Sequence, residues 1–306
     1  MSIHVIRAGL MTTVQDEGRW GFQTFGVPVS GPMDWYSHRA ANRMVDNPDM
    51  AATLEVTLIG PELEFGSSAT VAFTGARFHV EIDGRTAAPG TTHALSAGAR
   101  LQFAAREAGA RAYLAVGGGI SVPPVLGSRS THVAAGLGGV QGRPLKAGDR
   151  LAIGEPDGRR ASRRAVPVPF VPLTLPAGGA RVRVLPGPQA QPNESVLASL
   201  LGSRYSISPQ SDRFGYRLEG TALSLEAPTM ISDAVGVGWV QVTPSGQPIL
   251  LMADRQTTGG YPVIACVITA DLPLAGQLAP GDWIEFERCD RAEAIRALRS
   301  RVAPGA

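Results

Sequence analysis

The sequence has 306 residues, of which 44% are hydrophobic and 37 are glycine, and this content excludes a disordered chain. Its 28 basic and 26 acidic residues leave a net charge of only +2, which does not match the strongly basic surface of a nucleic-acid-binding protein. At about 100–200 residues per domain, the length is enough for two domains.

The residues that commonly bind metals or carry cofactors are few. Cys266 and Cys289 are the only cysteines and the five histidines are scattered, so we expect neither a disulfide framework nor a metal site. Lys146 is the only lysine, and its surroundings match neither a P-loop nor a biotin attachment site. We therefore expect no covalent biotin on this chain. Because neither a signal peptide nor a membrane helix is evident, we expect a soluble, cytoplasmic protein that binds no membrane.

Short β-branched runs, separated by glycine and proline, predict a mainly β protein. Several runs alternate between apolar and polar residues, and the turn residues lie close together, which favours barrels or sandwiches over βαβ units. In chain order, the predicted strands are 71–74, 78–82, 111–116, 181–185, 237–242, 249–252 and 263–268.

Helical patterns are confined to three short segments. The first, 33–45, stops before Asn47-Pro48 because proline disfavours continuation of a helix. The second, 193–201, ends at Gly202. The third, 290–302, begins with a capping-box pattern and has an apolar stripe of Ile295, Leu298 and Val302.

The composition divides the chain into two β domains, at 1–154 and 181–288, followed by a C-terminal helix and tail at 289–306. Between the domains, 155–180 is rich in arginine and proline; it is interpreted either as a solvated linker or as an electrostatic docking strip. The pattern Leu-x-x-Gly-Asp-x-apolar-x-apolar ends each half, within 144–153 and 277–286. This repetition suggests that the two domains are related.

The polar segment 252–262 is the first candidate site, because predicted strands flank it on both sides. Asp254, Arg255, Gln256, Thr257 and Thr258 precede two glycines, Gly259 and Gly260, and are followed by Tyr261. Glycines let backbone N–H groups approach a ligand, and an arginine beside such a nest suits a phosphate or carboxylate oxygen. The other interpretation is a tight turn in which Asp254 caps backbone amides.

The second candidate site is the segment 208–217. Its Asp212-Arg213 pair lies between Gln210 and aromatic residues, so it could line a wet cleft or be a surface pair. Three further polar segments, at 12–19, 29–34 and 127–131, do not exceed the pattern of a turn, a helix start or a cap.

Six long strings, in this order, resemble the family called allophanate hydrolase subunit 2, biotin-dependent carboxyltransferase-like, or the C-type subunit of 5-oxoprolinase. The first three are TTVQDEGRWGFQTFGVPVSGPMD (12–34), LEVTLIGPELEF (54–65) and YLAVGGGISVPPVLGSRST (113–131). The others are GLGGVQGRPLKAGD (136–149), SPQSDRFGYRLEG (208–220) and GQPILLMADRQTTGGYPVIACV (246–267). The resemblance covers residues 3–286.

The resemblance implies two cyclophilin-like β-barrel subdomains and a subunit of an ATP-dependent 5-oxoprolinase. Such an assembly cleaves 5-oxoproline to glutamate with a smaller homologous subunit of the allophanate hydrolase subunit 1 type and a third component. ATP, with or without Mg²⁺, would be shared with that complex. On this basis we expect Arg255 and Arg213 to bind anionic oxygens, with Asp254 or Asp212 to orient an arginine or bind metal. Substrate-positioning roles are expected for Gln256, Thr257, Thr258, Gly259, Gly260, Tyr261 and Gln210.

Two other functions stay open at this point. One is a carboxyltransferase subunit of a urea or biotin-dependent carboxylase, or an allophanate-hydrolase-type amidohydrolase, with biotin supplied by another chain. The other is a regulatory protein that binds an inhibitor of a histidine kinase. A mutation in the pocket should abolish the enzymatic functions and spare the regulatory one.

Overall fold

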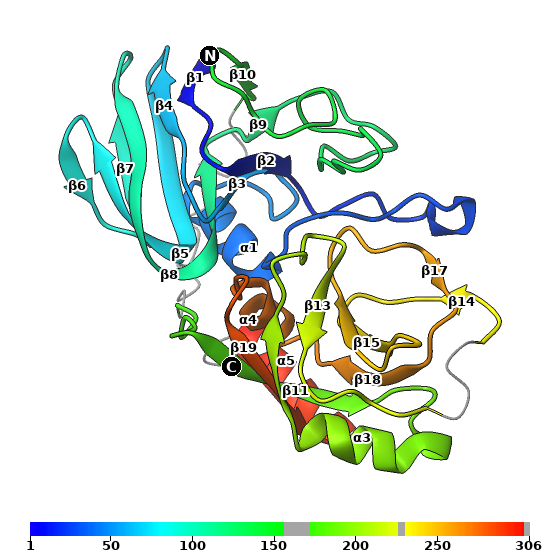
Figure 1. Cartoon of the computed structure of the whole chain (residues 1–306). Helices are drawn as coiled ribbons and strands as arrows, with labels where there is room; N and C mark the ends of the chain where they lie inside the picture. Colours follow the sequence, from blue (N-terminus) through cyan, green and yellow to red (C-terminus); the bar gives the residue numbers. More distant parts are fainter. Residues whose placement is uncertain (156–171, 226–229, 303–306) are drawn as a thin grey trace. The chain divides into compact units, whose positions relative to one another are not determined.

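The computed structural model describes residues 1–155, 172–225 and 230–302, and the chain divides into two compact units. Unit 1 comprises Met1–Arg19 and Ser30–Leu175, and unit 2 comprises Trp20–Val29 and Pro176–Ala306. Each unit is built around a closed or nearly closed β-barrel, which confirms the prediction of a mainly β protein with two barrels (Figure 1). Most of the segment expected to be a linker, 156–171, lies outside the described residues.

Unit 1 holds a ten-stranded sheet with the strand order β2-β3-β8-β4-β1-β10-β9, to which β5 is joined through β8. Apolar side chains on alternate positions of these strands form its core, as expected for a sheet with one buried face. The strands are β1 (Ser2–Arg7), β2 (Met11–Gln15), β3 (Thr53–Thr57), β4 (Glu62–Phe65), β5 (Ala69–Ile82), β6 (Arg85–Ala87), β7 (Thr92–Leu95), β8 (Arg100–Val116), β9 (Ile120–Ser121) and β10 (Arg150–Ile153).

Two of the predicted strands, 71–74 and 78–82, are parts of the single long strand β5, which pairs with β8 along most of its length (Figure 1). The register shifts between Gly75 and Arg77, and Gly75 has a φ of +92°. A glycine adopts this left-handed conformation without steric cost, so the strand bends at a bulge and continues. The sequence pattern predicts two separate strands because the bulge interrupts the run of strand-forming residues between 74 and 78.

Helix α1 (Trp35–Met44) confirms the first predicted helix, and the Asp34 side chain caps it by accepting a hydrogen bond from the Ser37 N–H at 2.9 Å. One cluster beneath the helix is apolar and includes Ala41, Ala72 and Ala115. Polar side chains of the same helix, such as Ser37 and His38, are buried as well.

The strands of unit 2 form a closed barrel in the order β11-β18-β15-β16-β13-β12-β19. Parallel pairing of β11 with β19 closes it, and a two-stranded ribbon of β14 and β17 lies outside that order. The strands are β11 (Gly179–Pro186), β12 (Arg204–Ile207), β13 (Gly215–Glu219), β14 (Asp233–Ala234), β15 (Trp239–Val242), β16 (Pro248–Leu251), β17 (Thr258–Gly259), β18 (Val263–Val267) and β19 (Trp283–Arg288).

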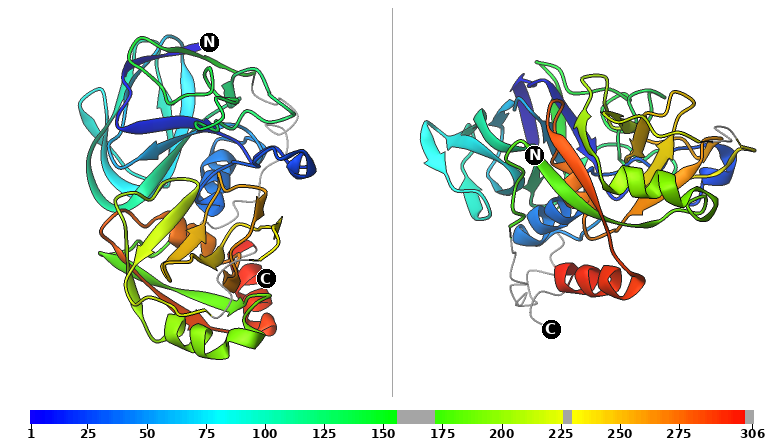
Figure 2. Two further views of the ribbon diagram at one scale, coloured as in Figure 1. Left: turned by 45° about the vertical axis from the view of Figure 1, so that its right-hand side comes forward. Right: turned by 60° about the horizontal axis from the view of Figure 1, so that its bottom comes forward.

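The helices of unit 2 are short. The predicted second and third helices are confirmed as α3 (Glu194–Leu201) and α5 (Arg291–Val302), whereas α4 (Leu272–Gly276) and the 3-10 turns η1 (Gln23–Phe25) and η2 (Gln191–Asn193) were not predicted. Asp290 and Glu293 form the expected capping box, with bonds of 2.8 and 2.7 Å. Figure 2 shows α5 as the last helix of the chain. Of the predicted apolar stripe on it, Leu298 packs against a small apolar cluster of unit 2, whereas Ile295 and Val302 remain exposed.

The repeated sequence pattern forms the same turn in both units. The Asp149 carboxylate accepts the Lys146 N–H at 2.7 Å, and the Asp282 carboxylate accepts the Ala279 N–H at 2.8 Å. The glycine before each aspartate has a φ near +90°, and each turn leads into a strand, β10 or β19. Only glycine adopts such a φ readily, so the Gly-Asp pair specifies this turn in both halves.

Candidate functional site

The pairing of β13 with β16 in unit 2 brings the two predicted site segments together. Gly215 lies opposite Leu251, and beyond this pair the Asp254 N–H donates to the Arg213 carbonyl at 2.8 Å. Segments that are about forty residues apart therefore share one end of the barrel wall. The sequence pattern indicates both segments but does not specify this register.

Arg213 and Asp254 form a buried ion pair at this end. Arg213 donates from Nε and Nη2 to the two carboxylate oxygens of Asp254, at 2.9 and 3.0 Å. This fork geometry fixes both side chains. Asp254 therefore holds the Arg213 guanidinium in one orientation, whereas the expected binding of anionic oxygens by Arg213 stays a prediction.

Asp212 and Gln210 take different positions. The Asp212 carboxylate accepts the N–H groups of Phe214 and Gly215, at 2.8 and 3.4 Å, so it shapes a local turn. Gln210 is exposed, and within the described ranges no hydrogen bond joins its side chain to the segment 252–262. The geometry leaves their predicted ligand roles without a supporting contact.

Arg255 has a different environment from Arg213. It is only 9% exposed, yet its guanidinium makes two long hydrogen bonds, to the carbonyls of Val235 at 3.4 Å and Met252 at 3.5 Å. No carboxylate in the described part of the chain forms an ion pair with it. Burial lowers the pKa of Arg255 below its ordinary value, and the nearby charge of Asp254 opposes this shift.

Thr258 and Gly259 form one strand, β17, of a two-stranded ribbon. The β14–β17 pairing places Thr258 opposite Ala234 and Gly259 opposite Asp233, and the Thr257 carbonyl accepts the Val235 N–H at 3.1 Å. Thr258 is exposed and Tyr261 is 37% exposed. The ribbon thus holds the segment after Arg255 in a defined, extended conformation.

The two glycines do not form the expected nest of backbone amides. Neither Gly259 nor Gly260 has the left-handed φ that a nest requires. A Cβ on Gly259 would instead lie 2.7 Å from Nε2 of Gln241 and 3.2 Å from Nε2 of Gln256. A side chain at position 259 would therefore require at least the Gln241 amide to move.

Sequence reasoning missed Gln241, a buried residue of β15. Its Nε2 donates to the Tyr261 carbonyl at 3.1 Å and so ties the candidate loop to the barrel wall. The only available indication was a glutamine within an otherwise apolar predicted strand.

The three polar segments that appeared to be simple turns or caps converge in unit 1. The buried Asp16 carboxylate accepts the Ser128 hydroxyl, the Arg129 N–H and the Ser130 hydroxyl, at 2.5, 2.5 and 2.7 Å. Burial alone would raise the pKa of Asp16, but these hydrogen bonds and one from the Gly18 N–H lower it overall. Asp16 therefore stays ionised and holds the 128–130 segment in place.

Arg19, from the same segment as Asp16, is also buried. It donates to the Ser30 hydroxyl at 3.1 Å and to the Ser130 carbonyl. Beside it, Gln15 donates through Nε2 to the Thr131 carbonyl at 3.1 Å. The segments 12–19, 29–34 and 127–131 thus make one polar cluster, and their separation in the sequence concealed it.

A second buried polar group lies beneath α1. The Glu55 carboxylate accepts the Tyr113 hydroxyl at 2.7 Å and the Met33 N–H at 2.9 Å, and the Tyr113 oxygen accepts the Asp34 N–H at 2.8 Å. Burial, followed by the charges of Glu55 and Asp34, raises the pKa of Tyr113 well above its ordinary value of 10. The hydroxyl therefore stays protonated and links β3 to the start of α1.

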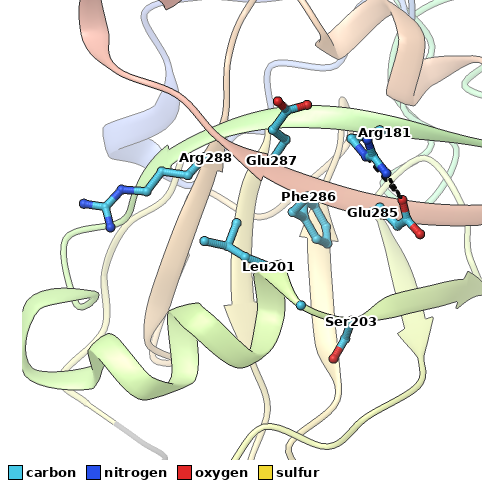
Figure 3. Close-up of a pocket in the computed structure, with 8 residues that line it drawn as sticks. Arg181, Leu201, Ser203, Glu285, Phe286, Glu287 and Arg288 are labelled. Carbon is cyan, nitrogen blue, oxygen red and sulfur yellow. Dashed lines mark hydrogen bonds and ion pairs between the residues drawn. The ribbon is translucent and has the colours of Figure 1, made fainter.

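A cavity of about 500 Å³ lies elsewhere in unit 2, between the end of α3 and β19 (Figure 3). Leu201 and Phe286 form its apolar part, while Arg181 and Glu285 form an ion pair at 2.9 Å on its wall. No predicted site residue lines it. The cavity is open to solvent, and the charge of Arg181 on its wall is already paired with Glu285. We therefore do not assign the candidate chemistry to this cavity.

Within residues 1–155, 172–225 and 230–302, no three His, Cys, Asp or Glu side chains are arranged to hold a metal ion. Over the same ranges, no helix has the length and apolar character required to cross a membrane.

A family model described as carboxyltransferase domain, subdomain A and B, matches residues 25–288. The chain is 41% identical to the C-type subunit of 5-oxoprolinase from Escherichia coli (strain K12), over 98% of this chain and 95% of that protein. It is 36% identical to the C-type subunit of 5-oxoprolinase from Haemophilus influenzae, over 97% of this chain and 94% of that protein.

Among solved structures, the crystal structure of Kluyveromyces lactis urea carboxylase matches with a TM-score of 0.88 and 32% identity. The match covers 98% of this chain but only 28% of that chain. The chain thus corresponds to one part of that much longer protein, while it matches the two bacterial proteins along almost their whole length.

Proposed function

Because the chain belongs to the carboxyltransferase domain family, subdomains A and B, we propose that it is the C-type subunit of a 5-oxoprolinase. The observation that carries this proposal is the 41% identity to a protein of that name, which extends over 98% of this chain. The proposed reaction is ATP-dependent cleavage of 5-oxo-L-proline to L-glutamate, in a complex with a subunit-1-type partner and a third component.

The reaction requires activation because a lactam amide is stabilised by resonance and resists attack by water. ATP, when bound to the complex, supplies the phosphoryl group that makes the lactam carbonyl susceptible to that attack. Charge develops on oxygen atoms during such a step, and fixed cations and N–H donors stabilise it. This chain offers one such cation, Arg255, whose buried guanidinium has no ion-paired carboxylate in the described part of the chain.

The residues around Arg255 would keep it in place. Asp254 binds Arg213 and so cannot turn both its oxygens to Arg255, which leaves that guanidinium available to an anionic oxygen. Gln241 and the β14–β17 ribbon hold the loop that carries it. We propose that Arg255 binds ligand and that Arg213, Asp254 and Gln241 position the loop.

The described residues fit an anionic oxygen better than they fit a metal ion. Arg255 suits a carboxylate or a phosphoryl oxygen, whereas Asp212 and Asp254 are engaged with backbone N–H groups and with Arg213. We therefore propose that any Mg²⁺ bound with ATP has its ligands on the partner subunits.

The chain would act in the same compartment as those partners, which we propose to be the cytoplasm.

The proposal is tested by reconstitution. The chain is co-expressed with its subunit-1-type partner and the third component, and glutamate release from 5-oxoproline is measured with and without ATP. We expect release only when all three proteins and ATP are present. Turnover that persists when this chain is omitted would contradict the proposal.

A second candidate, a carboxyltransferase that receives CO₂ from carboxybiotin, is favoured by the match to urea carboxylase over 98% of this chain. It requires a carboxybiotin carrier on another chain. The same purified chain can be supplied with such a carrier and an amide acceptor, and transfer of labelled CO₂ to nitrogen would favour this candidate. No comparison favours a regulatory function.

A further inference from the structure

Arg255 lacks a matched counter-charge among the described residues of its own unit. A guanidinium keeps its charge in proteins, and a buried charge without a paired partner is unfavourable. Its two hydrogen bonds, at 3.4 and 3.5 Å, are longer than the 2.7–2.9 Å of strong charged hydrogen bonds. A small anion would supply the missing charge and the missing short contacts.

The side-chain oxygen of the next residue, Gln256, accepts no hydrogen bond from the described part of the protein. Its Oε1 is buried and has no hydrogen-bond partner in the described part of the protein, while its Nε2 lies over the Cα of Gly259. Buried polar atoms are nearly always hydrogen-bonded, so an unpaired amide oxygen in an otherwise well-bonded loop requires an explanation. An N–H group of a ligand would satisfy it.

The two side chains share one neighbour, which places them at the same part of the loop. Arg255 Nε donates to the carbonyl of Val235, and the position that a Cβ on Gly259 would occupy lies 3.2 Å from both Gln256 Nε2 and Val235 Cγ1. A cation and a buried acceptor therefore lie around one residue. Together they match a ligand in which an anionic group and an N–H donor are close neighbours.

We propose that Arg255 and Gln256 form the substrate subsite of this chain and that it takes a small cyclic amide with a carboxylate on the carbon next to its nitrogen. Arg255 binds the carboxylate, and Gln256 Oε1 accepts the lactam N–H. This assignment rests on the proposed function, because it selects the lactam acid over a phosphate group as the anion that Arg255 binds.

The test pairs changes in the ligand with changes in the protein. Binding to the full chain, and to its complex, is measured by calorimetry for 5-oxoproline, for the lactone in which oxygen replaces the ring N–H, and for 2-pyrrolidone, which lacks the carboxylate. Inorganic phosphate is a fourth probe. The variants are Gln256→Met and Arg255→Gln, with Gln191→Met and Arg217→Gln as matched controls at exposed positions of unit 2.

In the wild type, the lactone should bind about five- to a hundredfold more weakly than 5-oxoproline, because it leaves the Gln256 oxygen unpaired. In Gln256→Met this difference should fall below about twofold. Arg255→Gln should weaken 5-oxoproline about tenfold or more and leave 2-pyrrolidone unchanged. The controls should match the wild type, and circular dichroism should show that every variant is folded.

Three results would overturn the assignment: a lactone that binds as tightly as 5-oxoproline, a lactam preference that survives in Gln256→Met, or phosphate that binds more tightly than 5-oxoproline. Absence of 5-oxoproline binding to both the chain and the complex would overturn it as well.

Failure of the proposed function is distinguishable from failure of the subsite. If the reconstituted complex releases no glutamate but the ligand pattern holds, the subsite stands without the activity. If the complex turns over but the pattern fails, the activity stands and the subsite lies elsewhere.

Discussion

The carboxylate of Asp254 binds the guanidinium of Arg213 through two hydrogen bonds of nearly equal length, 2.9 and 3.0 Å, and both side chains are more than nine-tenths buried. Their backbones are joined as well, because the Asp254 N–H donates to the Arg213 carbonyl at 2.8 Å. The pair therefore fixes the point at which the chain leaves β16 and enters the loop of Arg255.

Removal of one partner of this pair should destabilise unit 2 strongly. Asp254→Leu leaves the Arg213 charge buried without its carboxylate, and we expect a loss of about 3–5 kcal/mol in the free energy of unfolding, measured with urea. The double variant Asp254→Leu/Arg213→Met should recover part of this loss, because it removes both charges of the pair together. Equal stability of the single variant and the wild type would show that the pair contributes little.

Unit 1 should lose stability as the pH falls below about 6.5. Burial lowers the pKa of His38, while the charges of Glu17, Asp16 and Glu55 oppose the shift in part. Below 6.5 the unfolded chain binds a proton that the folded chain does not, so the stabilisation is complete above this pH and decreases towards the lower folded pKa. The slope is at most about 1.4 kcal/mol per pH unit.

Urea unfolding at pH 7.5 and 5.5 measures this effect, and His38→Gln should flatten the dependence, whereas His93→Gln, at a half-buried position of β7, should not. Asp16 does not contribute in this range, because its lowered pKa places its titration below 3.8. A wild-type stability that is constant from pH 7.5 to 5.5 would contradict the assignment of His38 as a buried neutral histidine.

The sequence was sufficient for the features that depend on local chemistry. Proline after Asn47 and glycine at 202 ended two helices near where the structure ends them, and Gly-Asp pairs specified the same turn in both units. It was less informative where tertiary contacts decide. The bulge at Gly75 appeared to be a strand end, and Ile295 appeared to face a core although it remains exposed.

In the candidate site, too, local features could be predicted and features that depend on tertiary contacts could not. The segment of Arg255 was recognisable because it is dense in polar residues and predicted strands flank it on both sides, and the segment of Arg213 because of its adjacent Asp212-Arg213 pair. That Asp254 would pair with Arg213 depends on the β13–β16 register, which no local pattern specifies. The cluster around Asp16 was missed because the 128–130 segment is more than a hundred residues from Asp16 and each segment alone is typical of a turn.

The substitution Gly259→Ala should disturb the candidate loop. Its Cβ would lie 2.7 Å from Gln241 Nε2, so one of the amides must move, and we expect a loss of about 1–3 kcal/mol. Gly202→Ala is the control, since its added Cβ has no atom closer than 3.4 Å. Urea midpoints measure both. A loss in Gly202→Ala as large as in Gly259→Ala would show that the packing of Gln241 is not the cause.

The thiol of Cys266 should react slowly in the folded protein. Burial raises its pKa to about 11, so about one molecule in a thousand carries the thiolate at pH 8. In Cys289→Ser, which leaves Cys266 as the only cysteine, a disulfide reagent should react at least about a hundredfold faster after denaturation, and the native rate should rise with pH beyond 9. A native rate that levels off near pH 8.5 would indicate an ordinary thiol.

Loss of the Arg255 guanidinium should reduce turnover of the reconstituted complex without unfolding the chain. We expect Arg255→Ala to lower kcat/KM for 5-oxoproline by about 10²–10³, because a fixed cation at an anionic oxygen is removed from a buried site. Arg255→Lys should restore only part of the activity, since an ammonium does not reproduce two parallel hydrogen bonds to a carboxylate. Arg217→Ala, at an exposed position of β13, provides the matched control. Turnover of Arg255→Ala within a few-fold of the wild type would exclude Arg255 from the reaction and leave the buried Arg213–Asp254 pair as a purely structural feature of unit 2.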